Sequence, residues 1–169
     1  VVDFAVNVRG EAPEFVRAAI ADACARLASY PSTAHADAAI AAICALHQRD
    51  PDEVMLLAGA ADGFEALPRL GSRHAALVQP SFTEPEIALR AAGIPITQVQ
   101  LPPPWCIDPD DIADRIPDDA DLVVVGNPTN PTSVLHSRAA LDAMRRPGRI
   151  LVVDEAFADL TVDPVTGER

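Results

Sequence analysis

Four short apolar runs alternate along the chain with stretches in which apolar residues recur at helical spacing. The runs are apolar on both faces and end at small or polar residues, a pattern typical of strands buried in a parallel sheet. They predict strands at residues 54–57, 75–78, 122–125 and 150–153. The intervening helical patterns lie at residues 15–30, 36–48, 62–70, 84–92, 108–115 and 137–145. This alternation predicts an α/β fold with a doubly wound, mostly parallel sheet, arranged as an α-β-α sandwich.

The composition narrows the classes of function. With 169 residues, the chain is long enough for one ordinary hydrophobic core. Its formal charge of −12 argues against partners such as nucleic acid or an anionic membrane surface. All 13 basic residues are arginines, so a lysine Schiff base and a phosphate-loop lysine are both excluded within this sequence.

The cysteines and histidines indicate no metal site. Three cysteines without paired spacing favour neither a disulfide framework nor zinc, and we expect a reducing, cytoplasmic location. No apolar stretch approaches the ~20 residues of a membrane span. The histidines also lack ligand spacing, and we expect surface or helix-packing roles for His35, His47, His74 and His136.

Small or polar residues follow three of the predicted strands, where ligands of doubly wound sheets bind. In residues 57–63, a small-residue turn opens a helix whose free N–H groups could hold a phosphate. A tight strand-to-helix connection explains the same residues and is favoured for this segment alone. Residues 127–132 contain two Asn-Pro units, in which proline holds the preceding asparagine extended. Such an amide could donate to a phenolate, although an Asn-Pro turn that merely ends a strand is the alternative.

Asp154 closes the last apolar run. A carboxylate at the mouth of a buried sheet is costly unless it meets a cation or several donors. A magnesium-nucleotide site would need a glycine-rich loop with a lysine, which this sequence does not have. The remaining interpretation pairs Asp154 with a protonated heterocyclic nitrogen. Together, a phosphate site, an amide donor and this acid match the requirements of pyridoxal 5′-phosphate (PLP).

The order of these motifs resembles the fold type I PLP enzymes of the class I and II aminotransferase family. Within the family, the chain is most similar to the branch that holds histidinol-phosphate aminotransferases and the threonine-phosphate decarboxylases of cobalamin biosynthesis. The resemblance covers nearly the whole chain. The motifs that carry it lie at residues 3–7, 30–31, 59–62, 80–82, 127–132 and 154–157.

This resemblance implies roles for particular residues. Backbone N–H groups of Ala60 and Ala61 would bind the PLP phosphate. Asn130 would donate to the phenolic oxygen of the ring, and Asp154 would pair with the pyridine nitrogen.

Two further residues have weaker assignments. Tyr30 would reach the phosphate in the neighbouring subunit of a homodimer, or else be a tyrosine at a helix end that caps the core. Asn7 matches a substrate-contacting asparagine, at even odds with a simple turn residue.

The sequence also departs from the family pattern. Pro85 occupies the position at which we expect an aromatic side chain to stack on the cofactor, and we expect Phe82 to pack elsewhere. Ser133 replaces the glycine that usually follows Asn-Pro-Thr.

The catalytic lysine of the family falls downstream of the Asp154 motif, together with a small C-terminal domain. Residues 1–169 are therefore expected to form a single, truncated PLP-binding large domain, with no catalytic residue of its own and no activity alone. The missing half of the site would come from a C-terminal half or a partner chain.

The leading functional hypothesis is the N-terminal portion of a PLP-dependent aminotransferase, or of a threonine-phosphate decarboxylase (a lyase) of cobalamin biosynthesis, acting on a phosphorylated amino acid. One alternative is a histidinol-phosphate aminotransferase of histidine biosynthesis. The other is a non-catalytic fragment that binds a phosphorylated ligand or a partner chain.

Overall fold

The structure is a computed structural model and describes residues 11–30 and 32–161. The chain divides into two compact units, Val1–Leu56 and Leu57–Arg169. Each unit is described by itself. The expectation of a single large domain remains a prediction.

The first unit consists of helices. Helix α1 (Glu14–Cys24) begins after Pro13 and has Glu14 in its first turn, where the helix dipole stabilises a negative charge. It ends earlier than predicted, because residues 25–29 form turns. Helix α2 (Thr33–His47) follows, and the short 3-10 helix η1 (Pro51–Glu53) closes the unit.

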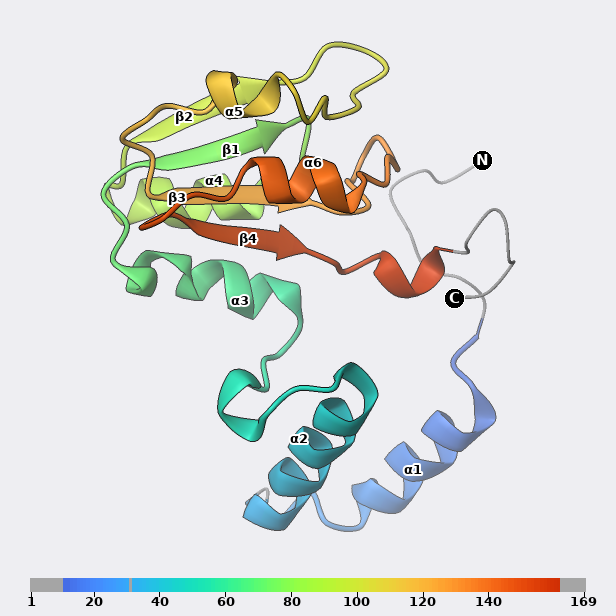
Figure 1. Ribbon diagram of the computed structural model, residues 1–169. Helices are drawn as coiled ribbons and strands as arrows, with labels where there is room; N and C mark the ends of the chain where they lie inside the picture. The colour runs from blue at the N-terminus through green and yellow to red at the C-terminus, as the bar shows by residue number, and fades with distance from the viewer. Residues whose placement is uncertain (1–10, 31, 162–169) are drawn as a thin grey trace, which may run out of the picture. The chain divides into compact units, whose positions relative to one another are not determined.

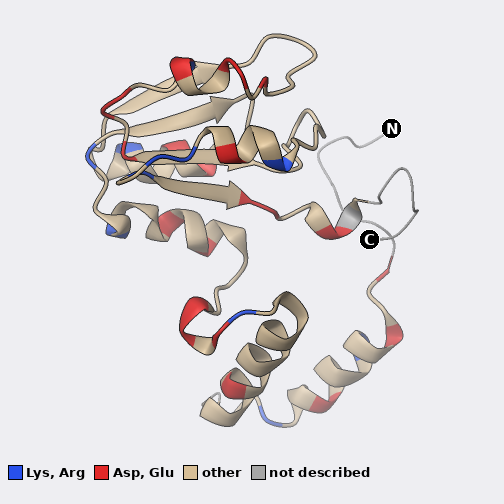
Figure 2. Cartoon of the chain, viewed as in Figure 1, with Lys and Arg blue, Asp and Glu red and all other residues tan. Residues whose placement is uncertain are grey.

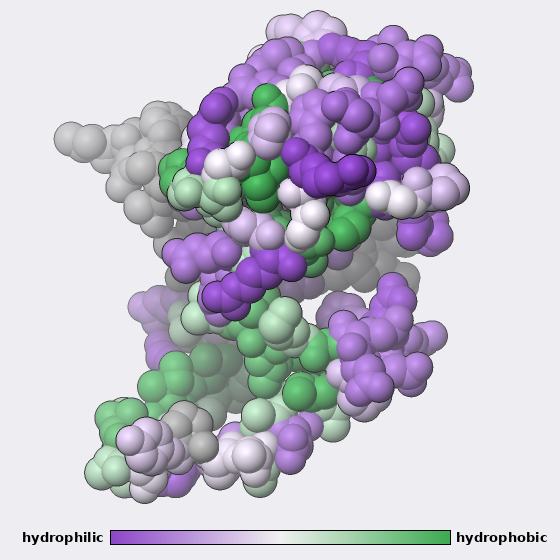
Figure 3. Space-filling view, turned by 90° about the vertical axis from the view of Figure 1, so that its left-hand side faces the viewer, coloured by the Kyte–Doolittle hydropathy of each residue, from purple (hydrophilic) through white to green (hydrophobic). Residues whose placement is uncertain are grey.

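No residue of α1 or α2 is buried in the described structure. Figure 3 shows hydrophobic residues at the surface of this helical unit. The large apolar side chains exposed on it include Phe15, Ile20, Leu27, Leu46 and Met55. Its stability therefore owes little to an internal core of its own.

The second unit is built on a four-stranded parallel sheet (Figure 1). Its strands are β1 (Ala75–Gln79), β2 (Ile96–Gln100), β3 (Leu122–Gly126) and β4 (Ile150–Asp154), in the order β2-β1-β3-β4. All three pairings are parallel, which confirms the predicted α/β class and parallel sheet. Every residue of β3 is buried, as the continuous apolar run predicts.

One predicted strand is absent, and one observed strand was not predicted. Residues 54–57 form no strand, and Met55, Leu56 and Leu57 are exposed. Strand β2 was missed because three of its five residues are polar and only Val99 is buried. It is an edge strand with one hydrogen-bonded neighbour, so its sequence does not need the continuous apolar run of a central strand.

Helices cover both faces of the sheet (Figure 1). On one face lie α3 (Ala60–Ala66), the 3-10 helix η2 (Leu67–Leu70) and α4 (Glu84–Ala91). On the other lie α5 (Ile112–Arg115) and α6 (Arg138–Ala143). The 3-10 helix η3 (Ala158–Leu160) follows β4. Each face therefore has its own layer of helices, as a doubly wound sheet requires.

Alternate residues along each strand point to opposite faces, so the core consists of two clusters. One cluster joins strand residues to α3, η2 and α4 through Phe64, Leu67, Ala75, Leu77, Leu89, Leu122 and Val124. The other includes Ala76, Val78, Ile112, Ile116, Val123, Val125, Ala140 and Met144. The two central strands are thus covered on both sides, which explains why residues 75–78 and 122–125 are all apolar.

Acidic residues are spread over both units, including the carboxyl end of β4 (Figure 2). Among the described helices, none has the length and apolar character needed to cross a bilayer.

Replacing Leu122 with alanine should destabilise the second unit by about 2–5 kcal/mol, because its fully buried side chain would leave a cavity. Urea denaturation of the variant measures this loss. The matched substitution Leu135→Ala, at a side chain that is 55% exposed, should cost less than about 1 kcal/mol. Equal losses in the two variants would contradict the placement of Leu122 in the core.

Candidate functional site at the carboxyl ends of the strands

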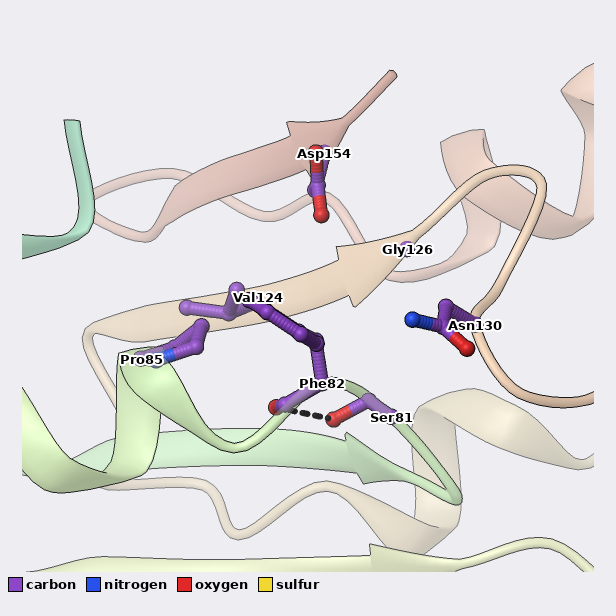
Figure 4. Close-up of a pocket in the computed structure, with 7 residues that line it drawn as sticks. All are labelled: Ser81, Phe82, Pro85, Val124, Gly126, Asn130 and Asp154. Atoms are coloured by element: carbon purple, nitrogen blue, oxygen red, sulfur yellow. Dashed lines mark hydrogen bonds between the residues drawn. The ribbon is translucent and has the colours of Figure 1, made fainter. Parts of the chain in front are cut away.

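The order of the strands determines where a ligand site can form. From β1 the chain first adds β2 on one side and then returns to place β3 on the other. The loops after β1 and β3 therefore leave the sheet in opposite directions, and a crevice opens between them. A small pocket, partly open to solvent, lies at this point (Figure 4). Its lining residues are Ser81, Phe82, Pro85, Val124, Gly126, Asn130 and Asp154.

Asp154 lies at the carboxyl end of β4, paired in register with Gly126 of β3. Its carboxylate is half-buried and directed toward the pocket (Figure 4). One oxygen, Oδ1, accepts a hydrogen bond from the backbone N–H of Ala156 at 3.1 Å. Within the described residues no arginine or histidine forms an ion pair with Asp154, and no basic residue lines this pocket. The carboxylate is therefore available to a cationic group of a ligand.

Asn130 lies in the turn that follows β3, and its amide nitrogen faces the pocket in Figure 4. The turn is closed by backbone hydrogen bonds from Thr129 N–H to Val134 O at 3.0 Å and from Ser133 N–H to Thr129 O at 2.7 Å. Ser133 has a φ of 59°, the left-handed conformation in which the family's glycine would be unstrained. The turn brings Asn130 to the same pocket as Asp154.

Gly126 permits the turn to fold back against the end of β3. A Cβ atom at this position would lie 3.2 Å from Thr129 Cα, closer than ordinary packing allows. The Thr129 hydroxyl also donates to Gly126 O at 2.6 Å, which binds the turn to the strand. The close approach requires glycine here.

Three polar residues beneath the turn are nearly inaccessible to solvent: Asn127, Thr129 and His136 are 7%, 5% and 6% exposed. Burial lowers the pKa of His136, because a charged ring would lose its hydration. The expectation that His136 is a surface or helix-packing residue is therefore wrong. The sequence does not predict that these three residues form a network. His136 lies nine residues after Asn127, and only the closed turn brings the two together.

The loop after β1 supplies the opposite wall of the pocket. Ser81 N–H donates to Gln79 Oε1 at 2.9 Å, and its hydroxyl donates to Phe82 O at 3.2 Å (Figure 4). Phe82 packs against Phe64 of α3, with ring centroids 6.2 Å apart and an interplanar angle of 49°. The expectation that Phe82 packs away from the site is wrong, because it lines the pocket together with Pro85. Its position directly after a predicted strand was the signal that could have placed it there.

The other predicted site residues do not line this pocket. Ala60 and Ala61 are exposed at the first turn of α3, after Gly59 with a φ of 85°, and Ala61 lines a separate pocket with Glu65 and Glu84. Tyr30 belongs to the first unit and is 98% exposed. Asn7 lies outside the described residues. The roles of these four residues remain predictions.

The pocket offers an unpaired carboxylate, an amide donor and an aromatic wall. These groups suit a flat heterocycle that carries a proton on its ring nitrogen and an oxygen at its edge. A metal ion is a poor match, because nowhere in residues 11–30 and 32–161 do three or more histidine, cysteine or acidic side chains cluster.

The sheet and its covering helices define an α/β domain of the doubly wound class. The model of the aminotransferase class I and II family matches residues 1–166, and the chain belongs to this family. Members of the family use PLP as their cofactor.

Individual relatives show how much of a whole family member is represented. The chain is 56% identical over 160 residues to a histidinol-phosphate aminotransferase of Mycobacterium tuberculosis, a match that covers 94% of this chain and 43% of that protein. It is 35% identical over 102 residues to a threonine-phosphate decarboxylase of a Sinorhizobium species, covering 57% and 27% of the two chains. A crystal structure from Erwinia carotovora atroseptica matches the fold with a TM-score of 0.82 at 22% identity, covering 96% of this chain and 49% of that one. The chain thus spans less than half the length of these relatives.

Substituting Gly126 by alanine should destabilise the protein by about 1–3 kcal/mol, since the added methyl group meets the backbone of Thr129 at 3.2 Å. Urea denaturation is the measurement. Gly63→Ala is the matched control: its Cβ would meet only the end of the Leu57 side chain, at 3.3 Å, and alanine favours the helix. A Gly126→Ala protein as stable as Gly63→Ala would contradict the close approach of the turn.

Stability should decrease as the pH falls below about 6.5, the pKa of an unfolded histidine. The folded-state pKa of His136 is lower than this, so in the window below 6.5 the unfolded chain binds a proton that the folded chain does not. The loss is at most about 1.4 kcal/mol per pH unit from this group. Denaturation midpoints between pH 7 and 5 should therefore change more in the wild type than in His136→Gln, and parallel profiles would refute the assignment.

Proposed function

We propose that the complete protein containing this chain is a PLP-dependent aminotransferase that acts on histidinol phosphate. The observation that supports the proposal most strongly is the meeting of Asp154 and Asn130 in one pocket, where β1 and β3 diverge. No basic residue of that pocket competes for the carboxylate.

Asp154 is proposed to accept the proton-bearing pyridine nitrogen of the cofactor. A carboxylate there keeps the nitrogen protonated, because an opposite charge nearby favours the charged form. When bound, PLP supplies an electron sink for the bond that breaks at the substrate α-carbon. The hydrogen bond from Ala156 N–H to Oδ1 holds the carboxylate in place and leaves Oδ2 for the ring.

Asn130 is proposed to donate its amide N–H to the phenolic oxygen, and Phe82 to provide the planar neighbour of the ring. Aromatic pairs prefer tilted or offset contacts, and Phe64 supports Phe82 from behind in such an arrangement. Phe82 would thus take the stacking role that the proline at position 85 cannot fill.

Ala60 and Ala61 are proposed to bind the cofactor phosphate through backbone N–H groups at the start of α3. Tyr30 would contribute from the neighbouring subunit of a homodimer, and Asn7 would contact the substrate. Because this chain has no lysine, the residue that attaches the cofactor would come from the rest of the protein.

The substrate class follows from the relatives. The proteins at 56% identity carry the name histidinol-phosphate aminotransferase, and their matches span 94% of this chain. These matches favour histidine biosynthesis over the cobalamin pathway that the motifs alone suggested. Threonine phosphate is the second candidate substrate, with loss of carbon dioxide as the reaction, because a decarboxylase matches at 35% identity over a shorter segment. Both candidates carry a phosphate and an amino group.

The complete protein, loaded with PLP, should be incubated with each candidate substrate. Transfer of the amino group from histidinol phosphate to 2-oxoglutarate, measured as glutamate formed, supports the proposal. Release of carbon dioxide from threonine phosphate alone would favour the second candidate. A protein that stays colourless with PLP, shows no borohydride-sensitive absorbance band and converts neither compound would support the non-catalytic fragment.

Asp154→Asn should reduce turnover on the order of 10²–10³-fold with a smaller loss of cofactor affinity, because the neutral amide no longer favours a protonated ring nitrogen. Turnover and PLP titration of the complete protein are the measurements. The control Asp159→Asn removes an exposed carboxylate just downstream and should leave both unchanged. Unchanged turnover in Asp154→Asn would refute the assigned role.

A further inference from the structure

We infer that His136, neutral and with its proton on Nε2, is the positioning residue that holds the turn carrying Asn130 and thereby directs the Asn130 amide into the pocket. This inference rests on the proposed function, because the amide has a task only when a ring oxygen lies opposite it. His136 itself does not line the pocket of Asp154.

The backbone of His136 is hydrogen-bonded to the side chain of Asn127, which lies at the start of the turn. Its N–H donates to Asn127 Oδ1 at 2.6 Å, and its carbonyl accepts from Asn127 Nδ2 at 3.4 Å. Asn127 is tied to β4 in turn, since its own N–H donates to Asp154 O at 2.8 Å. The two ends of the turn are therefore joined to each other and to the strand that carries Asp154.

The ring of His136 has a defined tautomer. The backbone N–H of Ile107 points to Nδ1 at 3.4 Å, so Nδ1 has to be the acceptor. The ring proton is then on Nε2, which lies 3.4 Å from Thr129 Oγ1. Because that hydroxyl gives its own proton to Gly126 O at 2.6 Å, it can accept from Nε2. In this series of hydrogen bonds each donor has one acceptor. The tautomer with its proton on Nδ1 would leave the N–H of Ile107 without an acceptor.

Asn130 depends on this arrangement. In the part of the chain that the structure describes, its side chain makes no hydrogen bond to another residue. Its direction is therefore set by the backbone of the turn, and the preceding residue is Thr129, which His136 holds. Weakening the contact between His136 and Thr129 should let the amide swing away from the pocket.

The surroundings of His136 favour the neutral ring. A protonated ring would set a second N–H against the N–H of Ile107. It would also add a positive charge to a pocket that His136 lines together with three arginines and two acids: Arg138, Asp142, Arg145, Arg149 and Glu155. Three of those charges belong to one ion-pair network, since Asp142 pairs with both Arg138 and Arg145. The geometry therefore points to a histidine that works only when uncharged.

Two substitutions separate the two sides of the ring. Asparagine can keep an acceptor near the place of Nδ1 but cannot reach Thr129, whereas glutamine can keep a donor near the place of Nε2. In the PLP-loaded complete protein, His136→Asn should raise the pH at which the absorbance band of bound PLP changes by roughly 0.5–1 pH unit. This corresponds to losing one hydrogen bond to the ionised phenolic oxygen. His136→Gln should titrate close to the wild type.

His74→Gln is the matched control. His74 also contacts a threonine, Thr97 Oγ1 at 2.9 Å through Nε2, but it precedes β1 at the opposite end of the sheet. Its replacement should leave the absorbance titration unchanged. A His136→Asn protein that titrates as the wild type does, or a His136→Gln protein altered as much as His136→Asn, would overturn the inference.

A second measurement does not depend on the cofactor. Nitrogen-15 chemical shifts of the His136 ring in the cofactor-free complete protein should show a proton on Nε2 down to well below pH 6.5. A proton on Nδ1, or titration at the ordinary histidine pKa, would overturn the inference even if neither variant folds. A wild-type protein that binds no PLP would instead refute the proposed function, while the ring measurement still decides the state of His136.

Discussion

The parallel pairing of β3 with β1 on one side and with β4 on the other is the constraint on which the rest of the second unit depends. It sets Gly126 beside Asp154 and Val124 beside Val152, so the carboxyl ends of two strands meet at one edge of the sheet. Since β2 lies on the far side of β1, the loops after β1 and β3 leave the sheet in opposite directions at that edge. Without this strand order the acid, the amide and the aromatic ring would not share a pocket.

Burying polar groups is the cost of bringing a turn back against the strand. Asn127, Thr129 and His136 are all below 10% exposure, and an unpaired buried polar group costs about 1–3 kcal/mol. Here each has a partner: the Asn127 side chain is hydrogen-bonded to the backbone of His136, and the Thr129 hydroxyl lies between the His136 ring and Gly126 O. The hydrogen bonds that offset the cost of burying these polar groups also restrict where Asn130 can lie.

The electrostatics of the site differ from those of the surface around it. Several exposed carboxylates elsewhere pair with arginines, such as Asp142 with Arg138 and Asp118 with Arg146. Asp154 has only the N–H of Ala156 among its described partners and faces a pocket with apolar walls. An acid left without a cation in such a place is better explained by a ligand than by stability. This contrast singles out Asp154 as the carboxylate that a cationic ligand of the family would meet.

Much of the second unit was readable from the sequence. Residues 75–78 and 122–125 are apolar without interruption because they are buried on both faces of the sheet. Residues 150–153 have the same apolar run, although β4 is an edge strand and is only partly buried. Asp154 and Asn130 could be found because they directly follow such runs. Strand β2 could not, since an edge strand needs no such run, and residues 54–57 were misread because a run of apolar residues does not reveal whether a partner strand is present.

What the sequence by itself determined was the class of fold, the family and the two polar residues at the strand ends. Only the tertiary structure decided that Phe82 faces the pocket, that His136 is buried beneath the turn and that Ala60 and Ala61 lie outside the pocket of Asp154. The physical reason is that burial patterns and turn motifs are local, whereas the direction of a side chain depends on which distant segment packs against it. Phe64 and Ile107 make those contacts here, and neither adjoins in sequence the residue that it orients.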